Sequence, residues 1–170
     1  MNTENVQKLK VLINEHPSKL MEIPDEEMLK TLGPGLWSGK EILGHIYDSA
    51  TMNRQRFIRS QYEELYEFPP YEQAQWVKIQ AYNNYKWTDL ISCCMSEYHH
   101  LIHILENLPD TSATNKCHVT FGSSDYVTID WLVGHVGRHT DFHLQQIYWI
   151  AGKGNLPDDR TLNQPVEELP

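Results

Sequence analysis

Long apolar segments are absent from this sequence of 170 residues. No stretch approaches the roughly 20 consecutive apolar residues that cross a bilayer. The opening residues, MNTENVQKLK, also lack the apolar core and the small-residue cleavage site of a secretory signal peptide. We therefore expect no membrane partner.

Cysteine is scarce as well. The sequence contains Cys93, Cys94 and Cys117, an odd number of thiols without the spacing of a metal-ligand motif. Such cysteines suit a reducing compartment better than a disulfide framework. We expect a cytoplasmic protein.

Basic residues are fewer than acidic ones. The sequence has 14 Lys and Arg against 23 Asp and Glu, which gives a formal net charge of -9. Proteins that bind nucleic acid hold its phosphates through clustered cations. Because no such cluster occurs here, we expect no nucleic-acid partner.

Four stretches carry apolar residues at the three-four spacing of an amphipathic helix. They cover about residues 5–16, 38–62, 88–108 and 129–151. The first helix is expected to end at Pro17. The second should begin at a capping box formed by Ser38 and Glu41, and the fourth should end at Gly152. This pattern, without βαβ alternation, predicts an all-α four-helix bundle.

The remaining segments are polar or irregular. Residues 110–128 are rich in Ser, Thr and Gly and predict a long polar connection before the last helix, with a hairpin in it. Residues 155–170 contain three prolines and are expected to form an irregular tail. We therefore expect one domain over residues 1–154.

Histidines occupy unexpected positions in the fourth helix. His139 and His143 fall on its apolar face, where packing alone would favour Leu or Ile. Residues four apart lie about 6 Å from each other on one helix face, so both imidazoles can bind one ion. The alternative is two core histidines that bond to backbone or carboxylate groups. A metal site also needs ligands beyond this pair.

His45, on the second predicted helix, is the candidate third ligand. A lone histidine there is more often a satisfied core residue, but it belongs to a longer pattern. That pattern is W-S-x-x-E-I-L-G-H-I-x-D-S-x6-R-F, from Trp37 to Phe57. The fourth helix reads G-R-H-x3-H-x2-Q-I, from Gly137 to Ile147, and P-P-Y-x4-W lies between the second and third helices.

Together these motifs resemble the DinB-like, YfiT-type superfamily of metal-dependent hydrolases, which is related to the bacillithiol S-transferases. The resemblance covers nearly the whole chain. It implies a four-helix bundle with up-down-down-up topology. It also implies one divalent metal ion, nickel or zinc, held by His45, His139 and His143.

The same resemblance implies an enzyme that transfers a low-molecular-weight thiol to an electrophilic small molecule. Two alternatives remain: an enzyme that hydrolyses its substrate with a metal-bound water, and a non-catalytic metal-binding protein. Thiol transfer and both alternatives would use the same three metal ligands. The expected partner is a small-molecule substrate, such as a low-molecular-weight thiol with its acceptor. The sequence leaves a homodimer open.

Three polar residues are spaced to act around the histidines. Asp48 and Ser49 follow His45 by three and four residues, and Gln146 follows His143 by three. Each is expected to bond a ligand or the substrate, as metal-bound histidines usually require. For Asp48, a solvated surface charge is the alternative.

The other histidines are weaker candidates. His135 precedes His139 by one helical turn, where it either lines the pocket or has no role, and we favour no role. The third helix carries His99, His100 and His103. Since Tyr98, Leu101 and Ile102 take the core positions there, we expect these histidines on a solvated flank.

Overall fold

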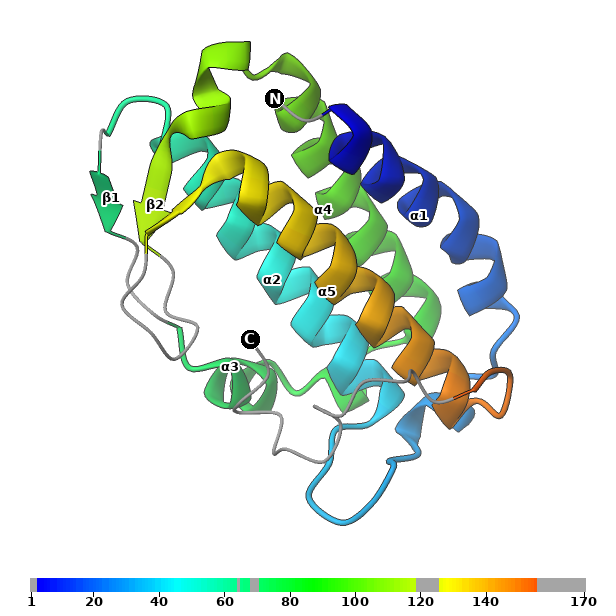
Figure 1. Cartoon of the computed structure of the whole chain (residues 1–170). Coiled ribbons are helices and arrows are strands. Elements are labelled where there is room, and N and C mark those ends of the chain that lie inside the picture. The colour runs from blue at the N-terminus through cyan, green and yellow to red at the C-terminus, as the bar shows by residue number, and fades with distance from the viewer. Residues whose placement is uncertain (1–2, 64, 68–70, 119–125, 156–170) are drawn as a thin grey trace.

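Four long helices form the body of the protein (Figure 1). The computed structural model describes residues 3–63, 65–67, 71–118 and 126–155. Its long helices are α1 (Thr3–Met21), α2 (Gly39–Arg59), α4 (Trp87–Asn107) and α5 (Ile129–Ile150). The predicted all-α four-helix bundle is confirmed. The expected tail lies outside the described residues, apart from Asn155.

Short elements fill the connections between the long helices. They are η1 (Glu27–Leu29), β1 (Leu65–Glu67), α3 (Gln73–Gln80), η2 (Tyr82–Asn84), η3 (Asp110–Thr114), β2 (Lys116–His118) and β3 (Tyr126–Thr128). Strands β2 and β3 pair antiparallel, which confirms the predicted hairpin, and β1 pairs with β2 in parallel. Sequence patterns did not predict β1, because a strand this short is defined by its distant partner rather than by its own residues.

The predicted start of α2 is confirmed in detail. The Ser38 hydroxyl accepts a hydrogen bond from the Glu41 amide at 3.2 Å. In return, the Glu41 carboxylate accepts one from the Ser38 amide at 2.9 Å. This reciprocal capping box satisfies two amides that the first turn of a helix leaves without partners. It fixes where α2 begins and therefore which face His45 occupies.

The end of α1 differs from the expectation. Pro17 lies inside α1, which continues to Met21, so the prediction that it ends the helix is wrong. Proline removes one backbone donor from a helix interior. Tertiary contacts compensate for this loss here: Leu20 is fully buried, and the Trp87 indole donates to its carbonyl at 2.9 Å.

The helices follow the up-down-down-up topology. Each of α1 and α2 contacts both α4 and α5. Helices α2 and α4 run in the same direction, as two contacts spaced along them show. Lys40 in the first turn of α2 donates to the Tyr85 carbonyl just before α4, and Arg54 farther along α2 pairs with Glu97 on α4.

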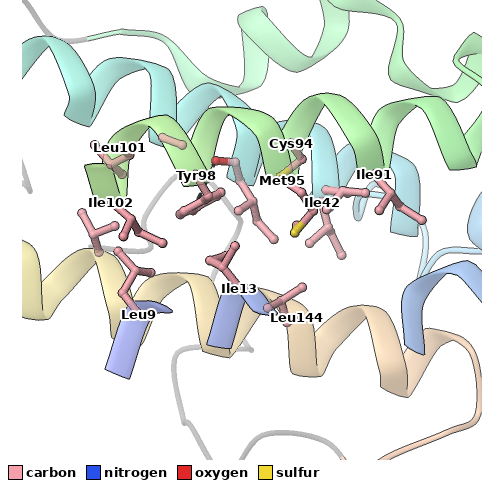
Figure 2. Packing of buried hydrophobic residues seen from close by; sticks show 14 of the residues in the cluster. Leu9, Ile13, Ile42, Ile91, Cys94, Met95, Tyr98, Leu101, Ile102 and Leu144 are labelled. Carbon is pink, nitrogen blue, oxygen red and sulfur yellow. Dashed lines mark hydrogen bonds between the residues drawn. The ribbon is translucent and has the colours of Figure 1, made fainter. Parts of the chain in front are cut away.

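Apolar side chains from all four helices fill the space between them (Figure 2). Among them are Leu9 and Ile13 of α1, Ile42 of α2, Leu144 of α5, and Ile91, Cys94, Met95, Tyr98, Leu101 and Ile102 of α4. Burial of this surface stabilises the bundle without any bound ion. None of the helices in the described ranges has the length and apolarity needed to cross a membrane.

Candidate metal centre

Three imidazoles from two helices converge inside the bundle. The Nε2 atom of His139 on α5 lies 3.2 Å from Nε2 of His45 on α2 and 3.2 Å from Nε2 of His143. All three nitrogens lie within 4.8 Å of one another. The structure therefore brings together the three residues that the sequence nominated as metal ligands.

The spacing of these nitrogens fits a shared ion. Imidazole nitrogens bound tetrahedrally to one zinc ion at about 2.0–2.1 Å stand about 3.3–3.4 Å apart. The two separations of 3.2 Å are close to this value. A neutral imidazole nitrogen carries either a proton or a lone pair. A divalent cation at their centre would satisfy three lone pairs at once.

Burial keeps the three rings neutral. His45 is 2% exposed and His143 is 1% exposed, whereas His139 is half-buried. Burial lowers the pKa of His143 to about 4 and holds the pKa values of His45 and His139 well below the ordinary range. The rings therefore present lone pairs rather than positive charges at neutral pH.

Gln146 determines which nitrogen of His143 faces the centre. Its side-chain oxygen lies 2.7 Å from Nδ1 of His143. An amide oxygen only accepts hydrogen bonds, so Nδ1 carries the proton and Nε2 keeps its lone pair. Such an outer partner is usual for a metal-bound histidine.

In the described part of the chain, the His45 ring lacks an outer hydrogen-bond partner like the one that Gln146 provides for His143. Its Nδ1 atom is buried and has no hydrogen-bond partner among the described residues. The indole of Trp37 packs against its ring instead, with centroids 5.0 Å apart and planes tilted by 38°. Packing rather than a hydrogen bond therefore holds this ring in place.

Asp48 is buried beside α3 and not solvated. It is 2% exposed, and one of its oxygens, Oδ1, accepts hydrogen bonds from Gln80 at 2.8 Å and from the Tyr82 hydroxyl at 2.7 Å. The other oxygen, Oδ2, is buried without a hydrogen-bond partner among the described residues. Burial raises the pKa of this carboxyl, against the effect of the two hydrogen bonds.

Tyr82 reaches Asp48 because Gly44 leaves room for its ring. A Cβ atom at Gly44 would lie 2.1 Å from Cδ2 of Tyr82. Sequence patterns missed both donors to Asp48, since Gln80 and Tyr82 lie in the α3–η2 segment far along the chain. The glycine directly before His45 was the available signal for a close approach.

Ser49 lies on the buried side of α2, farther along the helix from His45. The Asn53 amide donates to the Ser49 carbonyl at 2.9 Å and to its hydroxyl at 3.3 Å. Both residues are buried. Ser49 therefore belongs to a polar stripe on α2 that continues away from the three histidines.

His135 contacts a member of the triad, although the sequence favoured no role for it over a place lining the pocket. Its ring stacks on His139 with centroids 5.9 Å apart, and on Trp131 with centroids 5.1 Å apart and planes within 8°. The spacing of four residues from Trp131 through His135 and His139 to His143 was the available signal. By contrast, His99, His100 and His103 are exposed on α4, as predicted.

Comparisons with known proteins agree with the observed four-helix fold. Residues 17–147 match the model of the DinB superfamily. The fold is similar to that of YfiT from Bacillus subtilis, described as a probable metal-dependent hydrolase with an unusual four-helix bundle topology. The TM-score is 0.78 and the identity 17%, over 90% of this chain and 89% of that one. A search of curated proteins found no match. The family match spans most of the bundle, and the chain belongs to the DinB superfamily.

Proposed function

We propose that His45, His139 and His143 bind one divalent ion, nickel or zinc, at the centre of a metal-dependent enzyme. The reaction proposed first is transfer of a low-molecular-weight thiol to an electrophilic small molecule. The observation that carries this proposal is the convergence of three neutral Nε2 atoms. Three protein ligands are typical of catalytic zinc sites, whereas structural sites are closed by four.

A divalent ion bound by neutral ligands lowers the pKa of a coordinated thiol or water toward neutrality. The half-buried His139 marks the side from which a small molecule reaches the triad. His45 and His143 are closed off by the core. The chain's own contribution is to fix the tautomer of His143 through Gln146 and to exclude bulk water from His45 and His143.

Asp48 is the candidate proton carrier. Its Oδ2 atom is buried without a partner among the described residues, and burial raises its pKa. A carboxyl with a raised pKa exchanges protons more readily near neutral pH than an exposed one. We propose that Oδ2 receives the proton released by the thiol, while Gln80 and Tyr82 hold Oδ1.

Hydrolysis is the second candidate function. The description of YfiT as a probable metal-dependent hydrolase favours it, and the same three histidines serve both reactions. The third candidate is a non-catalytic protein whose bound metal only stabilises the fold. A cytoplasmic location and domain limits of 1–154 stay part of the proposal.

One set of assays separates these functions. Protein loaded with nickel or with zinc is supplied with a small thiol plus a chlorinated aromatic electrophile, and separately with simple esters and amides. Thiol transfer that His139→Ala abolishes supports the first proposal. Ester or amide cleavage that His139→Ala also abolishes supports the second proposal, hydrolysis. A metal-loaded protein that does neither, and whose metal has no exchangeable water, supports the structural reading.

A further inference from the structure

Tyr98 lies at the centre of the bundle, on a helix that carries none of the three proposed metal ligands. The residue belongs to α4 and is fully buried among apolar side chains (Figure 2). Helices α1 and α2 each contact both α4 and α5, so α4 and α5 lie diagonally across the bundle. The Tyr98 hydroxyl nevertheless lies 2.7 Å from the Thr140 hydroxyl on α5. It therefore spans the diagonal of the bundle.

The direction of the hydrogen bonds at Tyr98 follows from counting protons, since each hydroxyl has one proton to donate. The Thr140 hydroxyl donates its proton to the Val136 carbonyl at 2.7 Å, so the Tyr98 hydroxyl is the donor in its contact with Thr140. The Ile46 carbonyl on α2, at 3.5 Å from the Tyr98 hydroxyl, is a longer second contact. Burial raises the pKa of Tyr98 well above the ordinary range, which keeps the donated proton in place.

These two contacts lie next to proposed metal ligands. Thr140 directly follows His139 on α5. Ile46 directly follows His45 on α2. The Nε2 atoms of the two histidines lie 3.2 Å apart, and this distance depends on the spacing of the helices that carry them. Because the Tyr98 hydroxyl contacts both helices one residue beyond the ligands, it is placed to set that spacing.

Thr140 also connects Tyr98 to the local geometry of α5. A threonine in a helix divides between two side-chain conformations. When its hydroxyl bonds the carbonyl four residues earlier, as Thr140 does with Val136, the helix often bends. The hydrogen bond from Tyr98 favours the conformation in which the Thr140 hydroxyl faces the core. It thereby fixes the course of α5 directly beside His139.

We propose that Tyr98 is a positioning residue of the metal centre. Its hydroxyl holds α5 at Thr140 near α2 at Ile46, and so keeps His139 at the distance from His45 that one shared ion requires. This inference rests on the proposed metal site. It adds α4 to the elements that determine the geometry of the site, although α4 supplies none of the three ligands.

The test compares cobalt binding by the unmodified protein and by Tyr98→Phe, at a temperature where both are folded. The substitution removes the hydroxyl and keeps the buried ring. Thr140 keeps its bond to the Val136 carbonyl, so its donor stays satisfied. We expect cobalt affinity to fall about 2- to 10-fold, the factor that corresponds to one hydrogen bond, because a looser site must be ordered by the ion. The visible spectrum of bound cobalt, which reports ligand geometry, should change as well.

Tyr148→Phe is the matched control. The Tyr148 hydroxyl also joins α5 to another helix, since it lies 2.7 Å from Nδ1 of His16 on α1. Neither of these residues adjoins a proposed ligand in the sequence. Tyr148→Phe should therefore lower the melting temperature and leave cobalt affinity unchanged. An unchanged affinity in Tyr98→Phe overturns the inference, and so does an equal loss of affinity in Tyr148→Phe.

Thr140→Val tests the route by which Tyr98 acts. In protein that already carries Thr140→Val, the further change Tyr98→Phe should have little effect on cobalt affinity, because the two residues act through one hydrogen bond. Full additivity of the two substitutions overturns an action through Thr140.

A second arm uses chelator-treated protein and separates this inference from the metal proposal. Nitrogen-15 NMR follows the imidazole signals of His45 and His139. Tyr98→Phe should shift these signals, and Tyr148→Phe should leave them in place. An unmodified protein that binds no cobalt contradicts the proposed function alone, and the NMR comparison then decides the inference. Imidazole signals that stay unchanged in Tyr98→Phe overturn it.

Discussion

The side-chain oxygen of Gln146 lies 2.7 Å from Nδ1 of His143, one helical turn earlier on α5. This contact keeps the Nε2 lone pair of His143 directed toward His139 and His45. It also explains how a buried imidazole with a pKa of about 4 stays ordered without a charged partner. Two residues close in sequence thus set the geometry of a centre that spans two helices.

Replacing Gln146 should weaken metal binding without emptying the site. Outer partners of metal-bound histidines typically change affinity or activity by about 10–100-fold. We expect Gln146→Leu to lower zinc affinity within that range, and Gln146→Glu to restore much of it because a carboxylate also accepts from Nδ1. Competition titration against a chromophoric chelator measures both, and an unchanged affinity in Gln146→Leu would show that the contact has no role in binding.

The stack of Trp131, His135 and His139 gives a second prediction. His135→Ala should lower metal affinity, because His139 would lose the ring that fixes its orientation. His135→Phe should bind metal nearly as well as the unmodified protein, since it keeps a flat ring. Equal affinities for the alanine and phenylalanine variants would contradict a stacking role.

Gly44 and Gly137 form a matched pair for testing the packing beside the site. Gly44→Ala should destabilise the protein by about 1–3 kcal/mol, because its Cβ would meet the Tyr82 ring and displace the donor to Asp48. Gly137→Ala should be neutral or stabilising by up to about 1 kcal/mol, because a Cβ there meets nothing within 4 Å. Urea denaturation measures both, and equal effects would contradict the close approach at Gly44.

The metal-free protein should lose stability on acidification. The folded state keeps His135 and His143 neutral down to pKa values of about 4, whereas the unfolded chain protonates histidine near about 6.5. The unfolded state therefore binds more protons between these values, and stability rises with pH across this window. One pKa unit corresponds to about 1.4 kcal/mol.

Urea midpoints in the presence of chelator, from about pH 4 to pH 7, measure this dependence. His135→Phe should flatten the profile, since it removes one of the groups whose pKa falls on folding. A stability that stays constant over this range would contradict neutral burial of the rings.

Removing the metal should leave the bundle folded. Its apolar side chains pack between all four helices independently of the triad. Circular dichroism after chelation should keep its helical signal, and added metal should raise the melting temperature by mass action. Loss of that signal on chelation would show that the core depends on the ion.

Local sequence signals predicted much of the fold. The Ser38–Glu41 capping box fixed the start of α2, because both partners lie within one turn. Pro17 was misjudged, since the contacts that keep its helix intact come from Trp87, a long-range partner. Strand β1 was missed for the same reason.

The site divides in the same way, into features that local sequence predicts and features that depend on long-range contacts. His45, His139 and His143 were nominated from their spacing and from a family resemblance, and the structure brings them together. The donors to Asp48 could not be predicted, because Tyr82 reaches it across a tertiary contact that only Gly44 permits. Local periodicity identifies faces of helices, whereas partners from other elements require the fold.

Metal stoichiometry across histidine variants tests the proposed centre most directly. Protein purified without chelator or metal-affinity tag should contain about one divalent ion per chain, measured by elemental analysis near pH 7.5. His45→Ala, His139→Ala and His143→Ala should each lose it, because each removes one of three convergent nitrogens. His99→Ala and His103→Ala should retain it, because both residues are exposed on another helix. A protein that stays metal-free and refuses added nickel and zinc, or one emptied by His99→Ala but not by His45→Ala, would contradict the three-histidine centre.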